Sequence, residues 1–98
     1  MTVQKDPEGV EQRHLGGLVQ FAGKRVLEIG CGDGRLTWKY ARLARQVVGI
    51  DLDADGLRFA SIERPSDLEK SVAFVRASST GLPLPRATFD IALLAWSL

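Results

Sequence analysis

The sequence predicts an α/β fold in which a doubly wound parallel sheet is covered by helices. Short apolar segments of strand length alternate with segments that have helical spacing, as expected when crossover helices join parallel strands. The strand-like segments are apolar throughout, which is typical of a sheet buried on both faces. A glycine-rich turn follows the first of them, and right-handed crossovers then predict the first half of a doubly wound fold.

The composition is that of one soluble globular domain. Of the 98 residues, 45% are apolar, and 13 basic residues balance 12 acidic ones. The apolar content argues against a disordered tail. The balance of charges argues against a broad nucleic-acid surface. The longest apolar run, residues 91–96, is far shorter than the ~18–20 residues of a membrane span, and residues 1–12 lack a signal-peptide pattern. We therefore expect a cytoplasmic protein that does not bind membranes. Cys31 is its one cysteine, so a zinc site built from cysteines is not expected.

The N-terminal part is expected to begin with a flexible lead-in at residues 1–9, which contains Pro7 and Gly9. In residues 10–22 the apolar side chains are three and four positions apart, which predicts an amphipathic helix. Gly23 is expected to end this helix, since glycine readily adopts a positive φ. The first strand is predicted at residues 26–29.

Two helices, three strands and one loop are predicted in the rest of the chain. In chain order they are a helix at 36–45, a strand at 47–50, a helix between Asp53 and Pro65, a strand at 72–75, a loop at 81–85 and a strand at 89–95. Asp53 is the expected N-cap of the second helix, and Pro65 forces its end. Leu57, Ala60 and Ser61 are expected to lie on one face of this helix.

The turn after the first strand, residues 30–34 (Gly-Cys-Gly-Asp-Gly), is the most informative segment. Alternate glycines remove Cβ atoms where a backbone turns sharply and where a ligand approaches the main chain. Unpaired N–H groups at the start of the following helix are expected to face that ligand. Asp51 ends the second strand, where a carboxylate can bind two ribose hydroxyls. Together these features predict a ligand of the adenosine type.

The glycine spacing distinguishes two classes of such ligands. The dinucleotide motif G-x-G-x-x-G would need a third glycine at position 35, where this chain has Arg35. The observed G-x-G-x-G, preceded by Glu28, resembles motif I of the S-adenosylmethionine-dependent methyltransferases with a Rossmann-like fold. Residues 48–51 resemble motif II of that family, and residues 81–93 resemble the segment that leads into its fourth strand.

The resemblance implies a Rossmann-like sheet with strand order 3-2-1-4, truncated after the fourth strand. Residues 10–98 would be the N-terminal half of a cofactor-binding domain. The implied cofactor is S-adenosylmethionine, and the implied reaction is direct methyl transfer. The absence of a basic face favours a small-molecule acceptor over a nucleic acid. The implied cofactor-binding residues are Glu28, Gly30, Cys31, Gly32, Gly34, Asp51, Leu52, Ser78, Ser79 and Ala95.

The resemblance also gives several of these residues individual roles. The three glycines would wrap the methionine part of the cofactor, and Glu28 would bind its amino group, often through water. Asp51 would hold the ribose, and Leu52 would pack against the adenine. Alignment on residues 82–83 places Ser78 where the family commonly has an Asp, so a hydroxyl replaces the carboxylate that binds the adenine amino group. Ala95 would lie near the transferable methyl group.

The chain supplies only the first strands of the family's fold, so we expect it to be inactive by itself. Residues 91–96 would then form an apolar, unpaired edge that could pair with another copy or another chain. No catalytic residue is identified. Two alternatives stay open, a nucleotide- or NAD-binding module of an oxidoreductase and a non-catalytic interaction module that pairs through the fourth strand.

Two side chains near these motifs have simple structural interpretations. Cys31 lies between two glycines, and no histidine partner is apparent, so we interpret it as a small packing residue. Asp90 precedes the last strand and is expected to make a structural hydrogen bond there.

Overall fold

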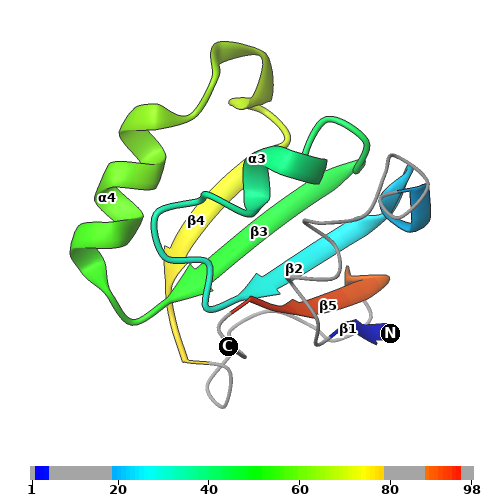
Figure 1. Cartoon of the computed structure of the whole chain (residues 1–98), viewed down its shortest axis with the longest axis horizontal. Helices are drawn as coiled ribbons and strands as arrows, with labels where there is room; N and C mark the ends of the chain where they lie inside the picture. Colours follow the sequence, from blue (N-terminus) through cyan, green and yellow to red (C-terminus); the bar gives the residue numbers. More distant parts are fainter. Residues whose placement is uncertain (1, 5–18, 79–87, 96–98) are drawn as a thin grey trace.

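The computed structural model describes residues 2–4, 19–78 and 88–95. They form a five-stranded parallel sheet in the order β1-β5-β2-β3-β4, with α3 and α4 on one face (Figure 1). In chain order the elements are β1 (Thr2–Gln4), the single-turn 3-10 helix η1 (Val19–Phe21), β2 (Arg25–Ile29), α3 (Thr37–Tyr40), β3 (Gln46–Asp51), α4 (Ala54–Glu63), the 3-10 helix η2 (Ser66–Leu68), β4 (Val72–Arg76) and β5 (Ile91–Leu94).

The predicted order of the four main strands is confirmed. Strands β4, β3, β2 and β5 lie side by side, which is the order 3-2-1-4, and every pair is parallel. In the register, Ile29 lies opposite Ile50 in β3 and Leu94 in β5. The carboxyl ends of these three strands therefore meet at one edge of the sheet, where the glycine-rich turn begins.

A fifth strand, which the sequence pattern did not predict, lies at the edge of the sheet. Thr2–Gln4 of β1 pair in parallel with residues 91–93 of β5. The lead-in expected at residues 1–9 therefore contains a short strand. The expectation of an unpaired fourth strand is wrong over residues 91–93, because β1 occupies the free N–H and C=O groups of this edge.

Helix α3 is much shorter than the helix predicted at residues 36–45. It ends at Tyr40, and the chain continues in turns to β3. The carbonyl of Leu43 accepts the N–H of Gly23, 2.9 Å away, and the N–H of Arg45 donates to the carbonyl of Lys24. The N–H of Ala44 still donates to the Tyr40 carbonyl, and beyond it these contacts with the turn before β2 replace helical hydrogen bonds. Leu43 is exposed.

Helix α4 follows its prediction closely. The Asp53 side chain accepts a hydrogen bond from the backbone N–H two residues on, as an N-cap residue does. Of the three residues predicted on one face, Leu57 and Ala60 are buried and Ser61 is exposed. Only a narrow face of α4 packs on the sheet. The helix ends before Pro65, as predicted.

The helix predicted at residues 10–22 lies largely outside the described residues. Its described end is η1, and Gly23 follows with a φ of 68°. This positive φ confirms that glycine ends the segment. The predicted loop at residues 81–85 also lies outside the described part of the chain. None of the helices in the described ranges is long and apolar enough to cross a membrane.

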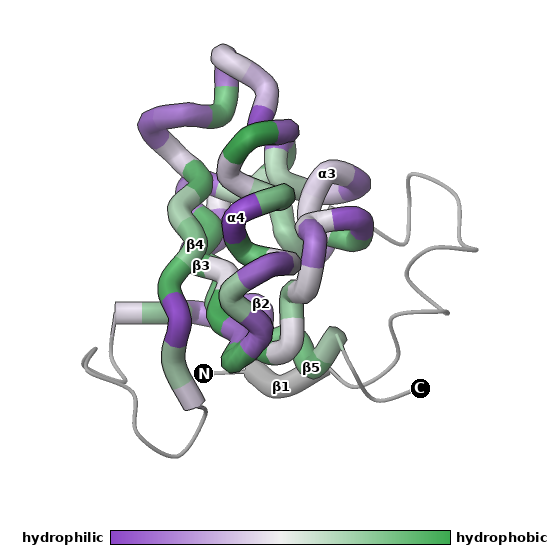
Figure 2. The backbone as a smooth tube through the Cα atoms, turned by 90° about the vertical axis from the view of Figure 1, so that its left-hand side faces the viewer, coloured by the Kyte–Doolittle hydropathy of each residue, from purple (hydrophilic) through white to green (hydrophobic). Residues whose placement is uncertain are grey.

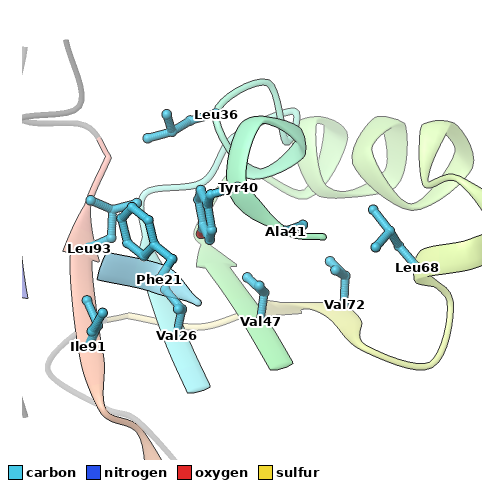
Figure 3. Close-up of a cluster of buried hydrophobic side chains, with 10 residues drawn as sticks. All are labelled: Phe21, Val26, Leu36, Tyr40, Ala41, Val47, Leu68, Val72, Ile91 and Leu93. Carbon is cyan, nitrogen blue, oxygen red and sulfur yellow. The ribbon is translucent and has the colours of Figure 1, made fainter. Parts of the chain in front are cut away.

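The main core lies on the face of the sheet that carries α3, between the strands and this helix (Figure 3). The ring of Phe21 stacks on that of Tyr40 with the ring centres 4.5 Å apart. Figure 2 shows hydrophobic residues along the strands and hydrophilic residues in the turns outside them. The buried residues of this cluster are Phe21, Val26, Leu36, Tyr40, Ala41, Val47, Leu68, Val72, Ile91 and Leu93.

Asp90 joins the starts of two neighbouring strands. Its Oδ2 atom accepts a hydrogen bond from the backbone N–H of Arg25 at 2.9 Å, and the Arg25 guanidinium forms an ion pair with the same carboxylate. These hydrogen bonds hold the pKa of Asp90 below its usual value. The structural role expected for Asp90 is confirmed, and it fixes β5 beside β2.

We predict that Gly49→Ala lowers the free energy of unfolding by about 1–3 kcal/mol. A Cβ at position 49 would lie 2.9 Å from both the Cys31 sulfur and a ring carbon of Phe74, so one of them must shift. Urea denaturation measures the loss. Ala73→Val, which adds atoms at an exposed position of β4, is the control and should change stability by no more than about 0.5 kcal/mol. Equal stability of Gly49→Ala and wild type would contradict this packing argument.

Candidate functional site

A pocket of about 260 Å³ lies where β2, β3 and β4 end. This is the edge at which open α/β sheets bind their ligands. The volume is close to the lower end of the range for small-molecule sites, about 300–1,000 Å³. The residues that line it are Ile29, Gly30, Ile50, Asp51, Leu52, Ala77 and Ser78.

The glycine-rich turn has a backbone that other residues would strain. Gly30, Gly32 and Gly34 have φ values of 79°, 53° and 84°, in the left-handed region that favours glycine. At Gly34 a Cβ would also lie 2.9 Å from the ring of Trp38. The alternate glycines predicted to shape the turn are therefore needed for its conformation as well as for any close approach of a ligand.

Asp51 ties the glycine-rich turn to the start of α4. One carboxylate oxygen accepts the N–H of Gly32 at 2.8 Å, and the other accepts the N–H of Asp53 at 2.9 Å. A carboxylate can accept about four hydrogen bonds. Two acceptor positions of Asp51 therefore stay available on a side chain that lines the pocket and is only partly buried.

The N–H groups of the turn are mostly used within the chain, which departs from the expected row of free donors. The donors of Gly30 and Cys31 bind the Ile50 carbonyl at 2.8 and 3.1 Å. Those of Gly32, Gly34 and Arg35 also have partners in the chain. Helix α3, which follows, is only one turn long. A phosphate-binding turn needs free N–H groups that point at the anion.

Glu28 is a fully buried carboxyl group beside this turn. Its Oε1 atom accepts hydrogen bonds from the hydroxyls of Thr37 at 2.9 Å and Tyr40 at 2.5 Å. Its Oε2 atom is also buried and has no hydrogen-bond partner among the described residues. Burial raises the pKa of Glu28 from 4.5 to about 7, although the two hydroxyl hydrogen bonds oppose this shift.

Cys31 behaves as the packing residue that the sequence predicted. It is 6% exposed, and burial raises the pKa of its thiol far above the usual range, with further contributions from the charges of Glu28 and Asp51. A thiol with so little thiolate character is a poor nucleophile. Its sulfur would be 2.9 Å from a Cβ at position 49, so it fills the space above Gly49.

The other predicted site residues lie at the same edge of the sheet. Leu52 lines the pocket with 62% of its surface exposed, and Ser78, which follows β4, lines it too. Ala95 follows β5, and its N–H donates to the Ile29 carbonyl at 2.8 Å. Ser79 lies outside the described residues, so its position stays a prediction.

Two sets of residues at this site were not predicted from the sequence. The apolar walls come from Ile29, Ile50 and Ala77. The position of the two isoleucines at the ends of strands that lead into the motifs could have indicated them. Thr37 and Tyr40, the two hydrogen-bond partners of Glu28, could not be found from the sequence pattern, because a contact between a strand residue and a later helix depends on the three-dimensional packing.

Comparison with known proteins gives one consistent result. A family model described as a methyltransferase domain matches residues 26–98. The chain is 44% identical over 59 residues to a ubiquinone biosynthesis O-methyltransferase of Cupriavidus pinatubonensis, which covers 60% of this chain and 22% of that protein. It is 38% identical over 73 residues to a fatty-acid O-methyltransferase of Mycolicibacterium smegmatis, with 72% and 26% covered. The chain thus spans about a quarter of the length of these curated relatives.

Solved structures agree with this result. An S-adenosylmethionine-dependent methyltransferase from Mesorhizobium loti matches with a TM-score of 0.64 and 27% identity, over 86% of this chain and 40% of the other. A methyltransferase from Thiobacillus denitrificans, solved in complex with S-adenosyl-L-homocysteine, matches with a TM-score of 0.66 and 27% identity, over 88% and 35%.

We predict that the protein becomes less stable as the pH rises from about 5 to about 8, by up to ~3 kcal/mol. Above pH 4.5 the unfolded chain loses the Glu28 proton, whereas the folded protein keeps it until about pH 7. Folding is therefore opposed increasingly across this window, and the cost is constant above it. The pKa values of Asp67 and Asp90 are lowered, so both stay ionised here.

Urea denaturation at several pH values measures this effect. Glu28→Gln should remove most of the pH dependence, because the amide carries no ionisable proton. Asp55→Asn changes an exposed carboxylate and should keep the wild-type profile. A wild-type protein whose stability is flat or rises across the window would contradict the burial of Glu28.

Proposed function

Because this chain belongs to the family of methyltransferase domains, we propose that it forms the cofactor-binding part of an S-adenosylmethionine-dependent methyltransferase. We further propose that the acceptor is an oxygen atom of a small molecule. Relatives named as O-methyltransferases support this choice. The near balance of basic and acidic residues also favours a small molecule over a nucleic acid.

The observation that carries the proposal is the chemistry of the turn after β2. Most of its N–H groups are bound within the chain, and the carboxyl groups of Glu28, Asp33 and Asp51 lie close enough to Cys31 in the turn to affect its thiol. Such a site suits a ligand with positive charge and hydroxyl donors. S-Adenosylmethionine has an ammonium group and a sulphonium centre against one carboxylate, so its net charge is positive and complementary to the acidic groups near the turn. Its ribose supplies two hydroxyl donors.

The pocket residues fit the parts of this cofactor one by one. Asp51 has two free acceptor positions, which match the two ribose hydroxyls. Ile29, Ile50 and Leu52 provide apolar surface for the adenine ring. We assign the hydrogen bond to the adenine edge to the region of Ser78 and Ser79.

The methionine part of the cofactor is assigned to the glycine-rich turn. Gly30, Gly32 and Gly34 allow close approach to the main chain, with Cys31 as the residue that packs beneath it. Glu28 has a buried oxygen without a partner among the described residues, and an ammonium group would satisfy it. Ala95, at the end of β5, is assigned to the neighbourhood of the reacting methyl group.

When bound, the cofactor would supply a methyl group on its sulphonium sulfur, and the sulfur is a good leaving group because it departs as a neutral thioether. The chain's own contribution is therefore to align the two reactants and to exclude water. Asp51 holds one end of the site through the ribose, and the turn after β2 holds the other. Asp51 is committed to two backbone N–H groups, and Cys31 stays protonated, so we assign neither as a general base.

Two alternatives lose support from the same geometry. A dinucleotide pyrophosphate needs free N–H donors, and Arg35 occupies the position of its third glycine. A module that pairs through the fourth strand needs an open edge, and β1 covers residues 91–93 of that edge.

We predict that S-adenosylhomocysteine binds the purified protein saturably, and that Asp51→Asn weakens this binding about 10–100-fold. The substitution weakens two hydrogen bonds to the ribose, which are stronger when the acceptor is ionised. Isothermal titration calorimetry measures both affinities, and circular dichroism checks that the variant is folded.

Asp55→Asn is the matched control, because Asp55 is exposed in the first turn of α4 and does not line the pocket. It should bind as the wild type does. NAD should bind far more weakly than S-adenosylhomocysteine. Equal affinity of Asp51→Asn and wild type, or tighter binding of NAD, would overturn the proposal.

A further inference from the structure

The two hydroxyl groups that bind Glu28 both reach the same carboxylate oxygen. Thr37 and Tyr40 are three residues apart on α3, so their side chains lie on one face of the helix. Each donates to Oε1, at 2.9 and 2.5 Å. Oε2 is left buried, with no partner in the described part of the chain.

Packing keeps the hydroxyl groups of Thr37 and Tyr40 at Oε1 of Glu28, so that neither can move to Oε2. Tyr40 is 1% exposed. Its ring stacks on that of Phe21 (Figure 3), so its hydroxyl is fixed in place. Thr37 is 0% exposed. The carboxyl group of Glu28 is thus held in one orientation, in which one oxygen is saturated and the other needs a donor from outside these elements.

We infer that Thr37 and Tyr40 are positioning residues, which hold Oε1 of Glu28 so that Oε2 accepts a hydrogen bond from the ammonium group of the cofactor, directly or through one water molecule. This inference rests on the proposed function, because it takes S-adenosylmethionine as the ligand. Neither residue touches the ligand itself. Both act through Glu28, whose orientation and ionisation they control.

The same contacts make ligand binding depend on pH. The neighbours of Glu28 across the sheet, Gly49 in β3 and Leu93 in β5, carry no charge. The titratable groups that interact with it are Tyr40 of α3 and Cys31 of the turn, and both have pKa values raised well above their usual range. Both therefore stay neutral near pH 7.

Glu28 then determines the pH dependence of binding near neutral pH. Its pKa is about 7 in the free protein, and an ammonium group at Oε2 lowers it by stabilising the carboxylate. Binding therefore releases a proton at lower pH. The affinity rises with pH up to about 7 and is level above it.

The test compares two ligands by calorimetry, S-adenosylhomocysteine and 5′-methylthioadenosine, which lacks the amino acid part. In the wild type, S-adenosylhomocysteine should bind about tenfold more weakly at about pH 6 than at about pH 8, because one proton must be released. 5′-Methylthioadenosine should show no such dependence, since nothing in it reaches Glu28.

Tyr40→Phe removes one donor from Oε1 without changing the ring that stacks on Phe21. It should weaken S-adenosylhomocysteine about 5–10-fold near pH 7 and move the midpoint of the pH profile upward by about one unit. The affinity for 5′-methylthioadenosine should not change. Thr37→Val should act in the same direction, and Thr37→Ser, which keeps a hydroxyl, should restore the wild-type profile.

The outcomes separate this inference from the proposed function. If Tyr40→Phe and Thr37→Val, both folded, leave the pH profile unchanged or weaken the two ligands equally, the positioning role is wrong and the cofactor assignment survives. If neither ligand binds the folded wild type, the proposed function itself fails. If Tyr40→Phe does not fold, the comparison of Thr37→Val with Thr37→Ser decides the question alone.

Discussion

The geometry of this site depends above all on the carboxylate of Asp51. It accepts the N–H of Gly32 from the turn after β2 and the N–H of Asp53 at the start of α4. The ends of two parallel strands are thereby joined by one side chain at the edge where ligands bind. Because the turn also donates two N–H groups to the Ile50 carbonyl, most of its N–H groups have partners within the chain, and the site presents carboxylate acceptors more than free donors.

Glu28 is the second acidic group at this edge, and its burial lowers the stability of the folded protein. A carboxyl group that is fully buried, with one oxygen unpaired among the described residues, disfavours folding near neutral pH. Local features that oppose stability are common where a protein binds its ligand. Here the feature is built into the sheet, because Glu28 lies in β2 and α3 packs directly over it.

The strands could be predicted because each is a short apolar run, and Asp51 could be predicted because it ends the second run, at the edge where the glycine-rich turn lies. Other features depend on contacts between distant residues. Helix α3 ends early because Gly23 binds the Leu43 carbonyl, and β1 is too short to give a pattern. The contact of Tyr40 with Glu28 could not be predicted, because a hydrogen bond between a helix residue and a strand residue appears only once the chain has folded.

The first measurement we would make is a crystal structure of the protein with S-adenosylhomocysteine, because it shows whether this acidic edge binds the adenosine and amino acid parts of the cofactor. We expect the ribose hydroxyls within hydrogen-bond distance of Asp51, while the hydrogen bond from Gly32 to Asp51 is retained. We also expect the amino acid part beside Gly30 and Glu28. A ligand bound away from the ends of β2 and β3, or one whose ribose leaves Asp51 without contact, would contradict the proposed site.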